Sequence, residues 1–344
     1  MPKSQTIMGV LPFGVMLVVA VIDVLAGPSL GFLPLLTLGP TFGATVGTVR
    51  RTALTGLVAL AICVPLAAYN DLLFTRQNNL TIATIAGVSG ASMLVSRLRI
   101  NRERELANVR LVAEVAQRVL LRPVPRRAGD LRIALSYTSA AAEAQIGGDL
   151  YEVVTTPHGV RVLIGDVQGK GLESVETAAW VLGAFREAAY EEDDLTRLCE
   201  RVEASLARHL NGESFVTAIM VEAHDGEVSV LNCGHPPPLI IRSDGRSETV
   251  EPPEDCLPLG LGDLGLPGPK ALRVPFCDGD LMLLYTDGVI EARDRDGVFF
   301  PLGDKLGLLR RDDPQLALDD LRSELLAHVG GPLPDDAAML LVRR

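Results

Sequence analysis

Four consecutive apolar stretches constrain the fold of this chain more than any other feature of its sequence. They cover about residues 8–26, 31–49, 52–70 and 79–96, and the last three contain no charged residue. Each approaches the ~20 residues that an α-helix needs to cross the hydrocarbon core of a bilayer. Prolines inside three of the stretches would break helices in water, but neighbouring helices accommodate them in lipid. We therefore predict an all-α region of four membrane spans over residues 1–96, with the lipid bilayer as its partner.

The positive charges between the stretches predict the orientation of this region. Lys3, the arginine pair at 50–51 and an arginine cluster over residues 97–104 lie on alternate connections. Connections rich in Lys and Arg stay on the cytoplasmic side. We predict a multi-pass protein of the inner (plasma) membrane whose soluble part is cytoplasmic. A cleaved signal peptide is the alternative for the first stretch, but a convincing small-residue cleavage site is absent and three more apolar stretches follow.

Asp23 is the one acidic residue inside a predicted span. Ionisable groups within a membrane are candidates for a function, because a charge there is costly unless it has a partner. Asp23 also lies near the end of its stretch, where it can sit at the interface, and we favour this structural or interfacial position.

Net charge and cysteine content narrow the function of the remaining chain. The formal net charge is −11, yet residues 1–96 hold four basic and two acidic residues, which leaves 28 basic against 41 acidic residues in the remainder. A soluble part this acidic is repelled by phosphate backbones, so we predict no nucleic-acid partner.

The five cysteines are widely spread and form no C-x-x-C pair. We interpret them as small buried residues in a reducing compartment, rather than as a disulfide framework or a zinc site.

A charged segment without Gly or Pro, residues 97–121, follows the last apolar stretch. Its apolar residues repeat at alternating spacings of three and four, which predicts a connecting helix with one seam: Leu106, Val109, Ala113, Ala116 and Leu120. The seam suits a short coiled coil that joins two copies in a homodimer, or an amphipathic helix packed on its own soluble domain. Prolines at 123 and 125 end the helix, so we place the soluble domain at residues 122–344.

Period-2 patterns dominate the soluble domain. Eight segments between Leu131 and Val342 alternate as strands do, and two long helical patterns over residues 172–190 and 195–210 separate the third strand from the fourth. A shorter helical pattern near residues 314–328 precedes the last strand. Consecutive hairpins favour a largely antiparallel α+β sandwich.

Aspartates recur beside glycine where predicted strands meet turns. The segments are Gly147-Gly148-Asp149, Gly165-Asp166-Val167, Thr286-Asp287-Gly288 and Asp335-Asp336. Carboxylates delivered to one place by different strands would repel one another, so their convergence would imply bound metal. Carboxylate oxygens without His or Cys favour Mg²⁺ or Mn²⁺ over Zn²⁺. Taken singly, each Asp-Gly is more often a turn residue, and that interpretation stays open at this point.

Five motifs in order, rather than any single aspartate, point to a known family. They are IGGDLYE at 146–152, IGDVQGKGL at 164–172, CGHPPP at 233–238, LYTDGVIEA at 284–292 and DDAAMLL at 335–341. As an ordered set they resemble the SpoIIE-type branch of the metal-dependent protein serine/threonine phosphatases, over roughly residues 117–344. The resemblance implies an α-β-β-α sandwich that binds two Mn²⁺ or Mg²⁺ ions. These ions would hold a water for in-line attack on phosphoserine or phosphothreonine, so no nucleophilic side chain is required.

The resemblance also assigns roles to individual residues. Asp166 would bridge the two ions, and the carbonyl of Val167 would complete the shell of one of them. Asp287 would bind the other ion, and Asp149 would act directly or through water. Catalysis is expected to depend most on Asp166 and Asp287.

The sequence leaves alternatives open for two neighbouring acids and two basic side chains. The family pattern makes Asp335 a ligand of the same ion as Asp287 and Asp336 a hydrogen-bonding residue, but a shift of one residue in the alignment would exchange them, so Asp336 stays a lesser candidate metal ligand. Lys170 suits either contact with phosphate or a solvated turn. His235 suits a structural turn better than a general acid. Glu152 departs from the family, which usually has Asp there.

The resemblance further implies a partner and leaves one alternative. Members of the family typically dephosphorylate a phosphoserine on an anti-sigma-factor antagonist, so a phosphorylated regulatory protein of this kind is the expected substrate. The alternative is a non-catalytic membrane receptor whose phosphatase-like domain only binds partners. Such decay would remove at least one carboxylate, and all the expected carboxylates are present in the sequence.

Overall fold

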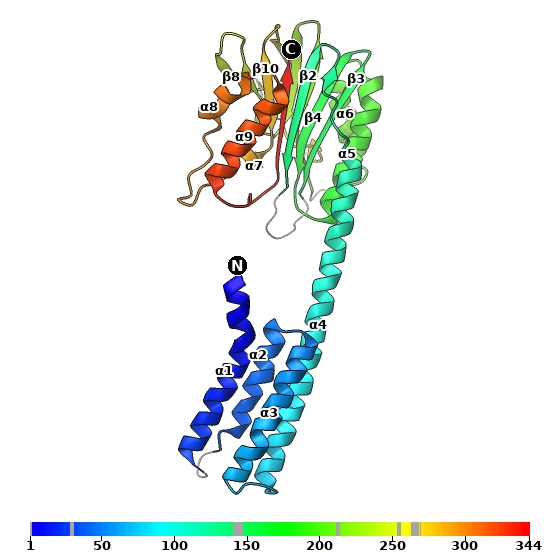
Figure 1. Cartoon of the computed structure of the whole chain (residues 1–344). Coiled ribbons are helices and arrows are strands. Elements are labelled where there is room, and N and C mark those ends of the chain that lie inside the picture. Colours follow the sequence, from blue (N-terminus) through cyan, green and yellow to red (C-terminus); the bar gives the residue numbers. More distant parts are fainter. Residues whose placement is uncertain are drawn as a thin grey trace. The chain divides into compact units, whose positions relative to one another are not determined.

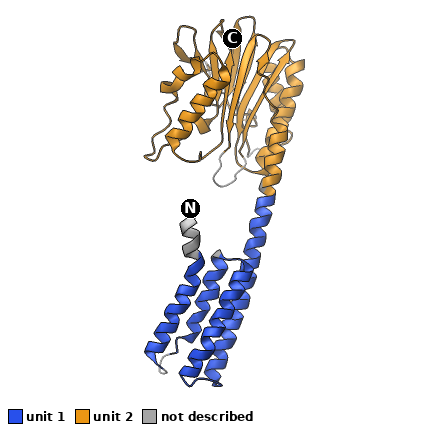
Figure 2. Ribbon diagram, in the orientation of Figure 1, with its two compact units in different colours: residues 1–108 blue, residues 109–344 orange. Residues whose placement is uncertain are grey.

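The chain forms two compact units, residues 1–108 and 109–344, which are coloured separately in Figure 2. The computed structural model describes residues 2–27, 31–139, 147–210, 214–252, 256–262, 268 and 270–344. Ile146, the first residue of the IGGDLYE motif, lies outside the described residues, as does most of the predicted connection between the first two apolar stretches.

The first unit is built from helices that pack side by side (Figure 1). The elements are α1 (Pro2–Ala26), η1 (Leu33–Thr37), α2 (Leu38–Val46), α3 (Val49–Tyr69) and α4 (Arg76–Leu120), of which α4 continues into the second unit. Small residues let these helices approach closely. A Cβ at Gly43 would lie 2.9 Å from Thr55 Oγ1, and one at Gly56 would lie 2.7 Å from Ser89 Oγ.

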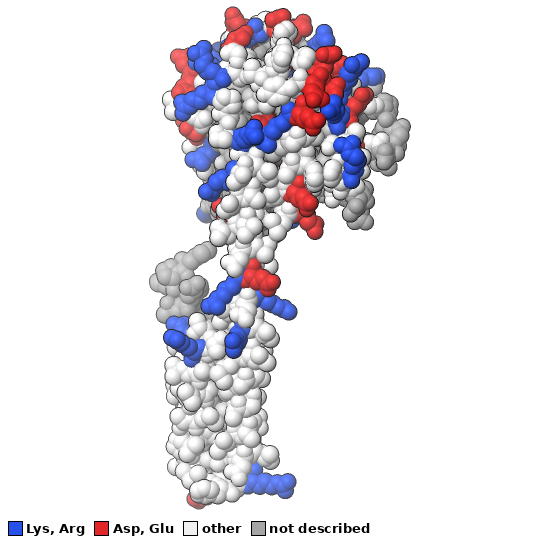
Figure 3. All heavy atoms as spheres, turned by 90° about the vertical axis from the view of Figure 1, so that its right-hand side faces the viewer, with Lys and Arg blue, Asp and Glu red and all other residues white. Residues whose placement is uncertain are grey.

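Three helices among the described residues are long and apolar enough to cross a membrane. They are the Gly9–Ala26 part of α1, α3 and α4, and Figure 3 shows a largely uncharged surface between the two ends of this unit. The predicted stretch 31–49 forms η1 and the nine-residue α2 instead of one long helix. Its many Gly and Pro residues explain the shorter helix, because Pro removes a backbone donor and Gly disfavours the helix. The number of four spans therefore stays a prediction.

Asp23 is fully packed inside the first unit, with 1% of its surface exposed. Its carboxylate accepts hydrogen bonds from Asn70 Nδ2 at 2.9 Å and from the backbone N–H of Phe32 at 3.2 Å. These bonds join α1 to the end of α3 and to the residue before η1. Two hydrogen bonds therefore hold the carboxylate of Asp23 in a structural position, as we favoured from the sequence.

The second unit contains two antiparallel sheets and the helices that flank them. The strands are β1 (Arg127–Ala128), β2 (Leu131–Thr138), β3 (Asp149–Thr156), β4 (Gly159–Val167), β5 (Val216–His224), β6 (Glu227–Cys233), β7 (Leu239–Ile241), β8 (Ser247–Thr249), β9 (Leu272–Pro275), β10 (Leu281–Tyr285) and β11 (Ala337–Arg343). One sheet has the order β1-β2-β11-β10-β7-β8 and the other β3-β4-β5-β6-β9. The helices are α5 (Leu172–Glu191), α6 (Leu195–Leu206), α7 (Asp287–Ile290), α8 (Leu302–Lys305), η3 (Leu306–Arg310) and α9 (Pro314–Val329).

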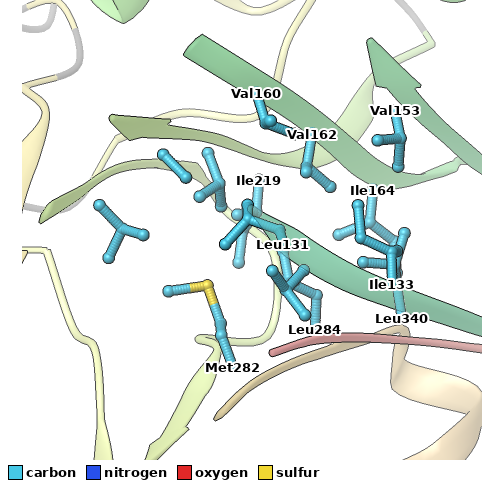
Figure 4. Close-up of a cluster of buried hydrophobic side chains, with 14 of the residues drawn as sticks. Leu131, Ile133, Val153, Val160, Val162, Ile164, Ile219, Met282, Leu284 and Leu340 are labelled. Atoms are coloured by element: carbon cyan, nitrogen blue, oxygen red, sulfur yellow. The ribbon is translucent and has the colours of Figure 1, made fainter. Parts of the chain in front are cut away.

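The two sheets share one hydrophobic core, which Figure 4 shows in close-up. Alternate residues of β4, such as Val162 and Ile164, point into this core, whereas Leu163 points to the opposite face. That opposite face packs against α5 and α6, and α9 packs against the outer face of the other sheet. The prediction of an α+β fold for the soluble domain is confirmed.

Part of the predicted seam of the connecting helix packs on the second unit. Ala113 is buried against Val175 of α5, and Ala116 and Leu120 pack beside them. Arg186 of α5 pairs with Glu152 and donates a hydrogen bond to the carbonyl of Leu120 at 2.8 Å. Glu152 is therefore accommodated as half of a partly buried ion pair.

Arg161 of β4 is a fully buried charged residue. Its guanidinium donates to Glu222 Oε2 at 2.7 Å on the neighbouring strand, and to the carbonyls of Ala189 and Glu192 at 2.8 and 2.7 Å. These carbonyls lie at the end of α5, where helical partners are lacking and a positive charge is favourable. The single side chain thus fastens α5 to the sheet.

We expect Arg161→Leu to lower the unfolding free energy by about 3 kcal/mol, because it leaves Glu222 and two carbonyls without their partner. In a domain of this size that loss corresponds to a fall in Tm of roughly 6–12 °C, which thermal denaturation of the full chain in detergent would measure. Arg246→Leu is the control, since Arg246 is exposed and forms its ion pair with the nearby Asp244. Equal Tm values for the two variants would contradict the assignment.

Candidate metal centre

Five aspartates reach the same end of the two sheets. Asp149 begins β3 and is the direct partner of Asp166, the penultimate residue of β4. Asp287 follows β10 and begins α7, and Asp335 and Asp336 precede β11, the strand paired with β10. The structure therefore brings together the carboxylates that the sequence placed on separate strand ends.

Thr286 joins the two sheets at this point. Its hydroxyl donates a hydrogen bond to Asp149 Oδ2 at 2.9 Å and accepts one from the backbone N–H of Ala338 at 3.0 Å. Thr286 and Asp149 are both buried. A side chain of one sheet thus orients a carboxylate of the other.

Glycines allow the backbone to approach these carboxylates. A Cβ at Gly147 would lie 1.7 Å from Asp336 Oδ2, and one at Gly288 would lie 1.8 Å from the carbonyl oxygen of Asp336. A Cβ at Gly148 would lie 2.3 Å from the carbonyl oxygen of Val167 and 2.6 Å from Asp166 Oδ1. Any larger residue would displace the groups that the site brings together.

The adjacent acids Asp335 and Asp336 have different surroundings. Asp336 is buried and accepts hydrogen bonds from the hydroxyl of Tyr137 and from Ser139 Oγ, the latter at 3.3 Å. Asp335 is about half exposed and forms an ion pair with Lys170 at 3.1 Å. Lys170 is thus more than a solvated turn residue, because its ammonium lies among the carboxylates.

Burial and the crowding of like charges raise the pKa values in the cluster. Burial, followed by the neighbouring charges of Asp287, Asp335 and Asp336, raises the pKa of Asp166 to about 7, although Lys170 opposes the shift. Burial and the charge of Asp166 raise the pKa of Asp149 well above its usual value. Burial and the charges of Glu291 and Asp335 raise the pKa of Asp287. The site is therefore short of positive charge.

Two residues that were not predicted from the sequence, Gln117 and Tyr137, form hydrogen bonds that hold parts of the site in place. Gln117, in the last turn of α4, uses one amide nitrogen to donate to the Tyr137 hydroxyl at 3.1 Å and to the carbonyl of Gly147 at 3.2 Å. The hydroxyl of Tyr137 in turn donates to Asp336. In the sequence, Gln117 stood out only as a polar residue beside the apolar seam of the connecting helix. That pattern is common on helices.

His235 has a structural position. Its Nε2 lies 3.1 Å from the carbonyl oxygen of Tyr285, which can only accept, so this nitrogen carries the proton. Its Nδ1 lies 2.9 Å from Thr217 Oγ1. Burial lowers the pKa of His235 to about 4, so the ring is neutral at pH 7. With both nitrogens occupied, His235 links β5 to β10, in agreement with the structural interpretation.

The chemistry of the donors fits divalent metal ions. Carboxylates and the Val167 carbonyl are hard oxygen donors, which suit Mg²⁺ or Mn²⁺, and the shortage of positive charge is what such ions would relieve. Within the described ranges no three His, Cys, Asp or Glu side chains are already gathered around one point for a metal. The fit therefore rests on donor type, charge and the glycine-lined approach of the backbone.

Comparison with solved structures defines the class of the second unit. The SiaA-PP2C domain of Pseudomonas aeruginosa matches with a TM-score of 0.58 and 16% identity, covering 71% of this chain and 98% of that one. The phosphatase domain and regulatory fragment of SpoIIE from Bacillus subtilis match with a TM-score of 0.53 and 19% identity, covering 63% and 64%. The fold is that of the PP2C, or PPM, phosphatases.

Sequence comparison then defines the family. A family model described as "Stage II sporulation protein E (SpoIIE)" matches residues 156–344, more than half of the chain. The chain belongs to the SpoIIE family. Stage II sporulation protein E of Priestia megaterium is 22% identical over 202 residues, and Protein IcfG of a Synechocystis strain is 27% identical over 131 residues. These matches cover 58% and 36% of this chain but only 34% and 20% of the two relatives.

The charge crowding predicts how stability depends on pH without divalent ions. A pKa of Asp166 raised to about 7 means that the folded state holds this proton more tightly than the unfolded state. The stability that this proton on Asp166 gives the folded state is therefore lost as pH rises from about 4 to 7. We expect the Tm of the full chain in detergent and chelator to fall between pH 5 and pH 8.

In Asp166→Asn this fall should be smaller, whereas the exposed turn variant Asp244→Asn should follow the parent. Differential scanning fluorimetry across the pH range measures both. The same slope in all three proteins would contradict the raised pKa of Asp166.

Proposed function

We propose that this protein is a membrane-anchored, metal-dependent protein serine/threonine phosphatase. The observation that carries the proposal is the convergence of five aspartates from four strand ends in a fold of the PP2C class. Burial and mutual repulsion raise the pKa values of three of them. Such a cluster favours metal binding over a role in turns alone.

The residues that would hold two Mn²⁺ or Mg²⁺ ions follow from this cluster. The carboxylate of Asp166 feels the charges of Asp287, Asp335 and Asp336, which suits a bridging position. The Val167 carbonyl and Asp149 would serve on its β3 side, and Asp287 and Asp335 on its α7 side, with Asp336 as a lesser candidate. When bound, the ions supply a lowered pKa for water and positive charge for the phosphoryl oxygens.

The surrounding side chains orient these acids and leave room for a substrate. Thr286 fixes one oxygen of Asp149, and Tyr137 fixes Asp336. A cavity of about 400 Å³ opens beside Asp287 and Asp335, and Glu291, Arg293, Val329 and Pro334 help to line it. A cavity with one arginine and an apolar wall beside the carboxylates suits a peptide segment that carries a phosphorylated hydroxyl.

The substrate would be a phosphorylated regulatory protein such as an anti-sigma-factor antagonist. Membership of the SpoIIE family supports this class. A structure titled as the RsbU and RsbW domains of Rv1364c from Mycobacterium tuberculosis shares the fold, with a TM-score of 0.51, 24% identity and coverage of 62% of this chain and 60% of that one. RsbU and RsbW are domains of that protein, and a similar regulatory role for this chain is proposed here by analogy.

The membrane region would place the phosphatase domain in the cytoplasm, as a multi-pass protein of the inner membrane. Three long apolar helices support membrane anchoring, and η1 with α2 would form a fourth, shorter span. Val112, Val115 and Val119 of α4 repeat at spacings of three and four and are exposed. This row, next to the predicted seam that packs on α5, would join two copies in a homodimer.

The catalytic proposal is tested by phosphate release from p-nitrophenyl phosphate and from a phosphoserine protein, using the full chain in detergent with and without Mn²⁺. We expect turnover only with metal, and a loss of at least about 100-fold in Asp166→Asn and Asp287→Asn, because each removes a charged ligand. Asp244→Asn, outside the cluster, should retain parental activity. Metal-independent turnover would contradict the proposal. Tight Mn²⁺ binding without turnover would favour the non-catalytic receptor instead.

The orientation is tested by fusing reporters to the full chain in bacterial cells. A fluorescent protein at the C-terminus should fluoresce, because it would remain in the cytoplasm. Alkaline phosphatase inserted after Asp71 should be active, because that connection would face outward. The reverse pattern would overturn the predicted topology.

A further inference from the structure

Three of the five cysteines lie together in the second unit, apart from the metal centre. Cys199 of α6 and Cys233 at the end of β6 are buried, and their Sγ atoms are 3.6 Å apart. Cys256 packs against the same hydrophobic cluster and is partly exposed. The prediction of small buried residues holds for the first two, whereas the third reaches the surface.

The segment that carries Cys256 packs closely on the turn that follows Cys233. Gly234 has a φ of +70°, and a Cβ there would lie 2.9 Å from Pro258 Cγ. Leu259 pairs with Val216 of β5 through hydrogen bonds of 2.8 and 2.9 Å. The two thiols are therefore held near each other by backbone contacts on both sides.

The three thiols differ in reactivity. Hydrogen bonds with Cys199 and Cys256, followed by burial, raise the pKa of Cys233, whereas the hydrogen bond with Cys233 lowers the pKa of Cys256. The thiolate is the form that reacts with oxidants, and access to solvent is also needed. Cys256 is partly exposed and its pKa is lowered, which favours the thiolate, while Cys233 is buried and packs close to it. This is the arrangement of a reacting thiol and a resolving thiol.

We propose that Cys256, Cys233 and Cys199 form a disulfide-forming site that responds to hydroperoxides. The Cys256 thiolate attacks a peroxide oxygen, the O–O bond breaks, and a sulfenic acid and hydroxide result. The Cys233 thiol then attacks the sulfenic sulfur, the S–S bond forms and water leaves. Two thiols lose two electrons in total, and hydrogen peroxide is reduced to two water molecules once the hydroxide takes up a proton.

Cys199 provides a second step. Its Sγ lies 3.6 Å from Cys233, so its thiolate can attack Cys233, form a Cys199–Cys233 disulfide and release the thiolate of Cys256. The exchange moves the disulfide from a partly exposed position into the core. Cys233 also lies two residues before His235, which links β5 to β10. The inference does not depend on the proposed phosphatase activity.

The test is peptide mass spectrometry of the full chain in detergent after hydrogen peroxide treatment and alkylation. We expect Cys233 in a disulfide with Cys256 or Cys199, reversed by dithiothreitol. Cys277 is a matched control, because it is exposed and lies outside this cluster; it should be oxidised without an intramolecular partner. Cys256→Ser should slow loss of the free Cys233 thiol at least about tenfold, because it removes the accessible thiolate.

Two results would overturn the proposal. One is full alkylation of Cys233 after a treatment that oxidises Cys277. The other is a Cys199–Cys233 disulfide that forms in Cys256→Ser at the parental rate, which would remove Cys256 from the pathway. Cys199→Ala provides an independent variant, in which only the Cys233–Cys256 bond should appear. A thermal melt under reducing conditions confirms that each variant is folded before it is oxidised.

Discussion

Partial or complete burial of neighbouring carboxylates is the constraint on which the second unit depends. Two antiparallel sheets bring Asp149, Asp166 and Asp287 to one end, and burial there makes their charges costly. The fold tolerates this arrangement because other interactions compensate for it: the hydrogen bond from Thr286, the hydroxyl of Tyr137 and the ammonium of Lys170. A site built from unfavourable contacts needs a rigid surrounding core, and the shared hydrophobic layer between the sheets provides it.

A few side chains, each with two roles, fasten helices α4 and α5 to the sheets and to the site. Arg161 satisfies the end of α5 and holds that helix on the sheet, while Arg186 of the same helix pairs with Glu152 and caps α4 at Leu120. Gln117, one turn earlier in α4, contacts both Tyr137 and Gly147. The last turn of α4 therefore helps to hold the carboxylate cluster in place. If this turn shifted on α5, the amide group of Gln117 would pass the shift to Tyr137 and Gly147.

The sequence predicted the parts of this protein that depend on local patterns. Alternation in segments such as β4 and β5 identified the strands, and the glycines beside Asp149, Asp166 and Asp287 marked the site, because both signals are contained within a few residues. Contacts between distant residues could not be predicted in this way. The pairing of Asp23 with Asn70, the support of Asp336 by Tyr137 and the grouping of three cysteines depend on how strands and helices pack. The stretch 31–49 shows the other limit, since its hydropathy suggested a long helix while its Gly and Pro content shortened it.

Lys170 gives the carboxylate cluster a tethered counter-ion of its own. Its ammonium lies 3.1 Å from Asp335 and eases the repulsion felt by Asp166 and Asp287. Any divalent cation that Asp335 would help to hold would compete with this ammonium for the same carboxylate. The side chain of Lys170 is 38% exposed, so it can turn toward solvent without leaving a buried contact. The affinity of the cluster for a divalent cation would therefore depend on a lysine that is not one of its ligands.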